Sequence, residues 1–212
     1  QAEDGIRDRS PSRGLGDVYK RQINIAALAL IGLTAVISIE DTLALKSGES
    51  ILIQGGAGGV AGFGIQLAKH IGAHVISTTS AANVEYVRNL GADEVIDYNA
   101  QDFRDVVSNC DVVFDTVGGE VAEKAFDVLR PGGRAAFIAS GTNGLESPSS
   151  DFVSLRPNVY RDRPHKERVL ALIAADVVTP PTIELFSLDE VVEAQKISQS
   201  RHFRGKLVFK IR

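Results

Sequence analysis

Short apolar runs rich in β-branched residues alternate with longer segments of helical periodicity from Gly48 onwards. This alternation is typical of βαβ units around a parallel sheet. It predicts six strands, at Ser50–Gln54, His74–Thr78, Glu94–Asp97, Asp111–Asp115, Ala135–Ala139 and Asp151–Leu155. It predicts helices between them, near Val60–Ile71, Ala82–Leu90, Asp102–Ser108 and Glu120–Leu129. The predicted fold class is therefore α/β, with a doubly wound, six-stranded parallel sheet of the Rossmann type.

The order of elements changes after Pro157. The pattern there predicts two helices and two strands, at His165–Asp176, Ile183–Phe186, Leu188–Gln199 and Lys206–Ile211. The two late strands do not fit the six-stranded sheet, so we expect them to belong to a second sheet that is mostly missing from this chain. The predicted division is a tail (residues 1–22), a nucleotide-binding domain (23–157) and a C-terminal region (158–212).

The first 40 residues contain two segments of different character. Residues 1–22 are rich in Arg, Asp, Ser and Gly and show no periodicity, so we expect a disordered or artefactual tail outside the fold. Ile23–Glu40 is apolar, but it is short for a membrane span and is interrupted by Asn24 and Thr34. We interpret it as a buried helix, with a targeting or membrane segment as the alternative.

Composition restricts the possible partners. The 212 residues are 44% hydrophobic and 24% charged, with a net charge of -4 and a pI near 5.6. These values argue against a broad surface for nucleic acid or anionic membrane. A single cysteine cannot form an internal disulfide, which fits a cytoplasmic protein. The single cysteine, Cys110, is expected to be buried, and the four histidines do not suggest a metal site. The chain has no methionine, so we expect a piece of a longer protein.

A glycine-rich stretch, Gln54–Gly64 (QGGAGGVAGFG), joins the first strand to the first helix. Gly56, Gly58 and Ala61 match the pattern GxGxxG/A. In a βαβ unit, this pattern permits a tight turn, close approach of a pyrophosphate and close packing of helix on strand. The anion then lies at the helix N-terminus, on free backbone N–H groups. The position between strand and helix predicts dinucleotide binding.

The end of the second strand indicates which dinucleotide binds. An NAD enzyme is expected to carry an acid about 20 residues after the loop. The stretch here offers Thr78, Ser80 and Asn83, and its first acid is Glu85. Hydroxyl and amide groups can bind a 2′-phosphate without repelling it, which favours NADP(H), with NAD possible. The missing acid also argues against a methyltransferase with a glycine-rich first turn.

Several motifs together carry a family resemblance. They are GLTAV (32–36), SGESILIQGGAGGVAGFGIQLAKHIGA (47–73), LGADEVIDY (90–98), VVFDTVGG (112–119), LRPGGR (129–134) and RGKLVF (204–209). With these motifs the chain resembles the zinc-independent quinone oxidoreductase branch of the medium-chain dehydrogenase/reductase family, over nearly everything after Ile23. The N-terminal GroES-like substrate domain of that family is not seen, and the resemblance implies that the late strands would complete its sheet.

The resemblance implies roles for individual residues. Thr34 would lie near the nicotinamide, together with Val117 and the segment Ile138, Ala139 and Ser140. The pyrophosphate would meet Gly58, Gly59 and Val60. Ser80 and Asn83 would bind the 2′-phosphate, and Tyr98 would lie near the adenosine phosphate. Many members of the family have lysine where Asn83 stands.

The implied activity is NADPH-dependent hydride transfer to a quinone, an enone or a similar activated double bond. The partner would be a small-molecule electron acceptor, and this chain by itself is expected to bind NADPH but to turn over little. An enoyl reductase module of a larger synthase would show the same features. The alternatives are a non-catalytic NAD(P)H-binding protein and, least favoured, a Rossmann-type methyltransferase. A homodimer is expected through the exposed edge of the sixth strand, Asp151–Leu155.

Overall fold

The computed structural model describes residues 11–139, 145–200 and 203–211. The helices and short helical turns are α1 (Pro11–Val36), η1 (Ile37–Thr42), α2 (Gly59–Ile71), η2 (Ala81–Asn83), α3 (Val84–Asn89), η3 (Phe103–Asp105), α4 (Glu120–Glu123), η4 (Lys124–Val128), α5 (Arg163–Ala174), η5 (Leu188–Glu190) and α6 (Val191–Ser200). The strands are β1 (Ser50–Gln54), β2 (His74–Thr79), β3 (Glu94–Asp97), β4 (Cys110–Asp115), β5 (Leu129–Phe137), β6 (Val153–Leu155), β7 (Ile183–Phe186) and β8 (Lys206–Phe209).

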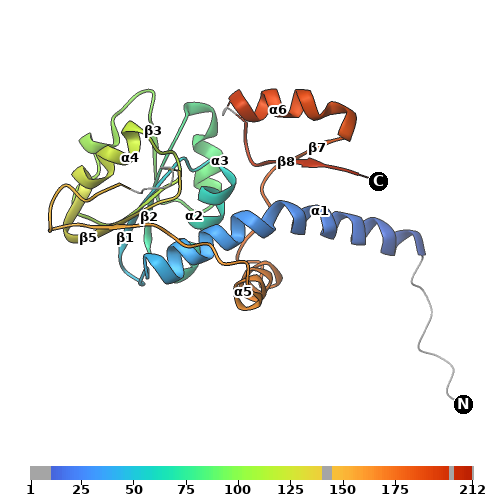
Figure 1. Ribbon diagram of the computed structural model, residues 1–212, viewed down its shortest axis with the longest axis horizontal. Helices are drawn as coiled ribbons and strands as arrows, with labels where there is room; N and C mark the ends of the chain where they lie inside the picture. Colours follow the sequence, from blue (N-terminus) through green and yellow to red (C-terminus); the bar gives the residue numbers. More distant parts are fainter. Residues whose placement is uncertain (1–10, 140–144, 201–202, 212) are drawn as a thin grey trace, which may run out of the picture.

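A six-stranded parallel sheet forms the body of the molecule (Figure 1), in the order β3-β2-β1-β4-β5-β6. This order confirms the predicted Rossmann fold, because the chain reverses direction across the sheet between β1 and β4. The crevice above the carboxyl ends of these two strands is the place where such sheets bind ligands. The glycine-rich stretch follows β1 and therefore lies at that crevice.

The two faces of the sheet carry separate apolar layers. On one face, Ile51 and Ile53 of β1 pack with residues of α1, α2 and α5. On the other face, Leu52 packs with Phe126 and Val128 of η4. Alternation along β1 thus supplies both layers, as expected for a strand that is buried on both faces.

The long helix α1 lies across α2 and α5 (Figure 1). Gly32 makes this packing possible, since a Cβ atom there would lie 2.7 Å from Val169 Cγ1 and 3.0 Å from Phe63 Cε2. The segment Gln22–Thr42 is long and apolar enough for a membrane span, but 61% of its 18-residue apolar window is buried within the protein. The structure therefore favours a core helix, as the sequence predicted.

The two late strands pair with each other in a separate two-stranded parallel sheet, β7-β8. In Figure 1 this sheet and α6 lie beside the main body, above α1. The helix α5 follows Pro157 in the chain, but its Val169 and Leu172 belong to the same apolar layer as β1. The chain after Pro157 thus contributes one helix to the main body before it forms the small sheet.

Three sequence predictions of local structure are wrong. Residues 11–22 of the predicted tail belong to the helix α1, whereas residues 1–10 of that tail lie outside the described residues. The predicted helix 102–108 is only the short turn η3, which Asp102 caps by accepting the N–H of Arg104. The predicted helix 120–129 divides into the single turn α4 and the 3-10 segment η4, in which Phe126 and Val128 are both buried.

The strand β5 also differs from its prediction, which was Ala135–Ala139. It begins at Leu129, which pairs with Cys110 before an irregularity in the β4 register. Gly132, with φ of +75°, lets the chain continue through the Arg-Pro-Gly-Gly sequence. The strand β6 is shorter than predicted and covers only Val153–Leu155.

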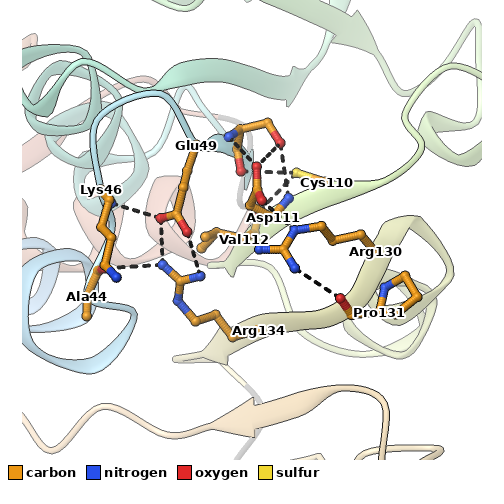
Figure 2. Close-up of polar contacts among 10 residues, drawn as sticks. Ala44, Lys46, Glu49, Cys110, Asp111, Val112, Arg130, Pro131 and Arg134 are labelled. Carbon is orange, nitrogen blue, oxygen red and sulfur yellow. Dashed lines mark hydrogen bonds and ion pairs between the residues drawn. The ribbon is translucent and has the colours of Figure 1, made fainter.

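Figure 2 shows two arginine–carboxylate pairs, Arg134 with Glu49 and Arg130 with Asp111, near the amino ends of β1 and β4. Arg134 donates to both oxygens of Glu49, at 3.0 and 2.6 Å, and to the Leu43 and Ala44 carbonyls. Arg130 donates to Asp111 at 2.5 Å. The Arg134 side chain holds the pKa of Glu49 below its ordinary value. These contacts fix the edge of the sheet that does not carry the candidate site.

Candidate cofactor site

The glycine turn joins β1 to α2 at the carboxyl edge of the sheet. Gly55 has a left-handed backbone, with φ of +79°, and the Gly58 N–H closes the turn on the Gly55 carbonyl at 2.9 Å. Gly58 is extended and caps α2, where its carbonyl accepts the Gly62 N–H at 2.8 Å. The turn therefore has the strand–turn–helix context that the sequence predicted.

Gly56 has a different role from the predicted one. Its φ is not positive, so the residue that makes the tight turn is Gly55. A Cβ atom on Gly56 would instead lie 2.3 Å from Ser77 Oγ and 3.0 Å from Val87 Cγ1. Glycine is thus required at position 56 because the turn packs directly on β2. Gly56 also donates its own N–H to the Thr78 carbonyl of β2 at 2.9 Å.

The first turn of α2 faces the crevice with free donors. The N–H groups of the first helical residues have no acceptor within a helix, and here they belong to Gly59, Val60 and Ala61. Gly58 is exposed beside them, and its missing Cβ leaves the turn bare. Donors at a helix N-terminus with no side chain above them fit a bound phosphate group.

The C-terminal strand lies against the same turn. Gly205 forms a bridge with Gly58, and its N–H donates to the Ala57 carbonyl at 3.4 Å. Lys206 lies so close to the start of α2 that a Cβ atom on Gly59 would be 3.0 Å from Lys206 Cδ. The turn thus acquires a cation from a residue about 150 positions further along the chain.

The end of β2 supplies a polar cluster. Asn83 donates to Ser80 Oγ at 3.1 Å and accepts from Arg204 Nε at 2.9 Å. The Arg204 guanidinium also lies over the Tyr86 ring, 4.7 Å from its centroid, and donates to the Ala82 carbonyl. Ser80 and Asn83, predicted as phosphate ligands, therefore come together around an arginine.

Two other residues predicted at this end have different surroundings. Thr78 is 4% exposed, and its Oγ accepts the Gly55 N–H at 3.2 Å, so the structure gives it the role of supporting the glycine turn. Tyr98 is 53% exposed and follows β3, where its N–H donates to the Thr79 carbonyl at 3.1 Å. Tyr98 thus lies at the same sheet edge, with a side chain open to solvent.

A second tight turn, after β4, packs beside the glycine turn. Asp115 is buried and accepts the N–H groups of Val117 at 3.2 Å and Gly118 at 2.9 Å. Burial raises the pKa of this carboxyl group. Gly118 has φ of +81° and fits closely against Ala139. This turn therefore lies against Ala139 through Gly118 and against Gly55 through Val117, and the role of Val117 and Ala139 at the nicotinamide stays a prediction.

A cavity of about 480 Å³ opens along this edge. Thr34 and Ile138, which were predicted near the nicotinamide, line it together with Val60, which was predicted at the pyrophosphate. Thr34 donates its hydroxyl to the Leu30 carbonyl at 2.9 Å, which leaves the oxygen able to accept. Ser140, also predicted at this place, lies outside the described residues.

Two cations near the site, Arg204 and Lys206, had no predicted role. Both belong to the RGKLVF motif, which supported the family resemblance but received no role. Their contacts with distant parts of the chain show where they lie, Lys206 beside the start of α2 and Arg204 at the end of β2. In the parts of the chain that the structure describes, no group of three or more His, Cys, Asp or Glu side chains is arranged to hold a metal ion.

Comparisons with known proteins agree on one family. The family model described as zinc-binding dehydrogenase matches residues 90–209. A 2-methylene-furan-3-one reductase of Solanum lycopersicum is 36% identical over 187 residues, which cover 86% of this chain and 45% of that protein. The chloroplastic NADPH-dependent alkenal/one oxidoreductase of Arabidopsis thaliana is 34% identical over 77% of this chain and 41% of its own length.

Comparison with solved structures supports the same family. A quinone oxidoreductase from Coxiella burnetii superposes with a TM-score of 0.75 at 30% identity, over 86% of this chain and 58% of that one. The chain thus spans about half the length of these relatives. Because the family model covers more than half of the chain, and the relatives are named as quinone and enone reductases, the chain belongs to the medium-chain dehydrogenase/reductase family, in its quinone oxidoreductase-like branch.

Proposed function

We propose that this chain is the cofactor-binding part of an NADPH-dependent oxidoreductase whose acceptor is a quinone, an enone or a similar activated double bond. The observation that carries the proposal is the bare glycine turn before α2, flanked by the cations Arg204 and Lys206. Family membership adds support, because the relatives compared above are named as reductases of such compounds. It also argues against the methyltransferase alternative.

The diphosphate would bind at the glycine turn. Gly59, Val60 and Ala61 offer N–H groups at the positive end of the α2 dipole, and Lys206 adds a full charge. A negative group is stabilised there by hydrogen bonds whose donors are already fixed by the helix. The turn therefore needs no rearrangement to receive it.

The choice of NADPH over NADH would depend on Arg204. A guanidinium binds phosphate through several donors, and Asn83, which itself donates to Ser80, holds this one at the end of β2. No acidic residue lies between Thr78 and Asn83 to repel a 2′-phosphate. The same stretch provides no carboxylate for the two ribose hydroxyls of NADH. NADPH is therefore favoured twice, because Arg204 attracts its 2′-phosphate and because NADH lacks a carboxylate partner.

The residues of the cavity would position the reacting end. When bound, NADPH supplies the hydride, which adds to the electrophilic carbon of the acceptor while a proton from solvent adds to the neighbouring atom. Thr34 and Ile138 form part of the wall beside the nicotinamide site, and Val60 lies between that wall and the glycine turn. These side chains orient the ring and exclude water from it.

Fluorescence titration of the chain with NADPH and with NADH tests the proposal. We expect the chain to bind NADPH more tightly than NADH. The Gly58→Val change should abolish binding of both, because a branched side chain would occupy the bare side of the turn. Arg204→Gln should weaken NADPH about tenfold or more and leave NADH nearly unchanged, since only NADPH loses a charge-assisted hydrogen bond.

The matched control is Arg88→Gln, which removes the same charge from an exposed position on α3. It should change neither titration. Equal affinity of the parent chain for both cofactors would contradict the NADPH preference. Unchanged NADPH binding by the Gly58→Val variant, with an unchanged circular dichroism spectrum, would contradict the placement of the cofactor.

A further inference from the structure

The cavity beside the predicted nicotinamide site has apolar walls and a basic rim. Its walls include Leu30 and Ile31 of α1, Phe137 at the end of β5, and Val159. Its charged lining residues are Arg156, Arg161 and Lys206. No carboxylate from the described residues lines it. The cavity therefore combines space for a hydrocarbon group with an uncompensated positive charge.

The three cations are free to bind a ligand. Within the described residues, no hydrogen bond or ion pair is formed by the side chain of Arg156, Arg161 or Lys206. Nearby arginines outside the cavity behave differently, since Arg163 pairs with Glu167 at 2.6 Å and Arg168 with Glu40 at 2.6 Å. Positive groups that gather around one cavity without partners indicate an anionic ligand.

The positions of these cations separate two parts of the cavity. Lys206 lies at the first turn of α2, where it would meet the cofactor diphosphate. Arg156 directly follows β6, and Arg161 lies in the connection from β6 to α5. The order β1-β4-β5-β6 places the end of β6 three strand spacings, or about 14 Å, from the glycine turn. The two arginines thus approach the cavity from the β6 side of the sheet, whereas Lys206 approaches it from the glycine turn.

We infer that Arg156 and Arg161 bind a carboxylate on the electron acceptor, so that the preferred acceptors are activated alkenes or quinones that carry a carboxylate. This inference rests on the proposed function, because it assumes that the cofactor occupies the glycine turn. The planar guanidinium group matches a carboxylate through two parallel hydrogen bonds. Anchored there, the acceptor would extend along the apolar wall toward Thr34 and Ile138, where the nicotinamide is proposed to lie.

The test compares two probes of nearly the same shape, one anionic and one neutral, 4-(3-oxobut-1-enyl)benzoate and its carboxamide. Both contain the same enone and the same ring. Binding of each to the chain saturated with NADPH is measured by isothermal titration calorimetry at low and high salt. We expect the carboxylate to bind about tenfold more tightly than the amide at low salt, and the difference to shrink as salt is added.

Two variants and one control locate the effect. Arg156→Gln and Arg161→Gln should each reduce the preference for the carboxylate, and the double variant should abolish it, with NADPH affinity unchanged. Arg163→Gln removes the same charge just outside the cavity and should keep the full preference. Equal binding of the two probes by a chain that still binds NADPH would overturn the inference and leave the proposed function intact. Failure to bind NADPH at all would instead refute the proposed function.

Discussion

Replacing Gly56 by alanine should destabilise the protein through a single crowded contact. The new Cβ atom would lie 2.3 Å from Ser77 Oγ, whereas ordinary contact begins at 3.4 Å, so about 1.1 Å must be opened. Ser77 cannot move freely, because its buried hydroxyl donates to the Ile53 carbonyl at 2.7 Å. Overpacking of this kind costs about 1–3 kcal/mol. Because the crowded atom belongs to β2, the cost should appear in global unfolding and not only in ligand binding.

Urea unfolding followed by circular dichroism measures this cost. With an m-value of about 3 kcal/mol/M, the midpoint should fall by about 0.3–1 M. The nearby Gly58→Ala change is the control, since its Cβ atom would meet only the Gly55 carbonyl, at 3.2 Å and with an ordinary backbone. It should lower the midpoint less.

A double-mutant cycle with Ser77→Ala isolates the contact. Ser77→Ala alone should cost about 1 kcal/mol, because it removes one buried hydrogen bond. In the double variant the crowded oxygen is gone, so Gly56→Ala should add much less than it does alone. If the two costs simply add, or if Gly56→Ala is neutral, the crowding at Ser77 is not the reason for glycine at this position.

Three further predictions concern other parts of the structure. Because Arg134 lowers the pKa of Glu49, this ion pair should stabilise the protein fully above about pH 4.3 and lose its effect as the pH falls through the lower pKa of the folded state. Glu49→Gln should flatten that part of the plot of stability against pH. An unchanged plot would contradict this prediction. Gly205→Ala should detach β8 and weaken NADPH binding. The new Cβ atom would lie 2.0 Å from the Thr182 carbonyl oxygen, and Gly205 has a left-handed backbone with φ of +81°. Unaltered affinity for NADPH would show that β8 does not support the site. Two copies of the chain should form a dimer through the exposed edge of β6, and light scattering would detect this dimer at micromolar concentration. Val153→Lys, at an exposed position of β6, should convert the dimer to monomer. A monomeric parent chain would refute edge pairing.

The sequence predicted the sheet because each βαβ unit carries its own local signals. Alternation of apolar residues in β1, the glycine turn, and the helical period of α2 are all properties of contiguous segments, and the strand order then follows from ordinary Rossmann topology. The predictions failed where local signals were short. The turns η3 and η4 are too brief for periodicity to separate a single turn from a helix, and α1 continues through residues that show no amphipathic pattern.

The candidate site also has features that depend on local sequence and features that depend on contacts between distant residues. The sequence by itself determined the glycine turn and the polar, acid-free end of β2, because both follow directly from residue types at the end of a strand. Only the tertiary structure decided that Gly56 packs on Ser77, that Thr78 supports the turn, and that Lys206 reaches the turn and Arg204 the end of β2 from the far end of the chain. These contacts join residues separated by roughly 20 to 150 positions. Periodicity and motif spacing describe neighbours along the chain, whereas such pairs are brought together by packing of the whole fold.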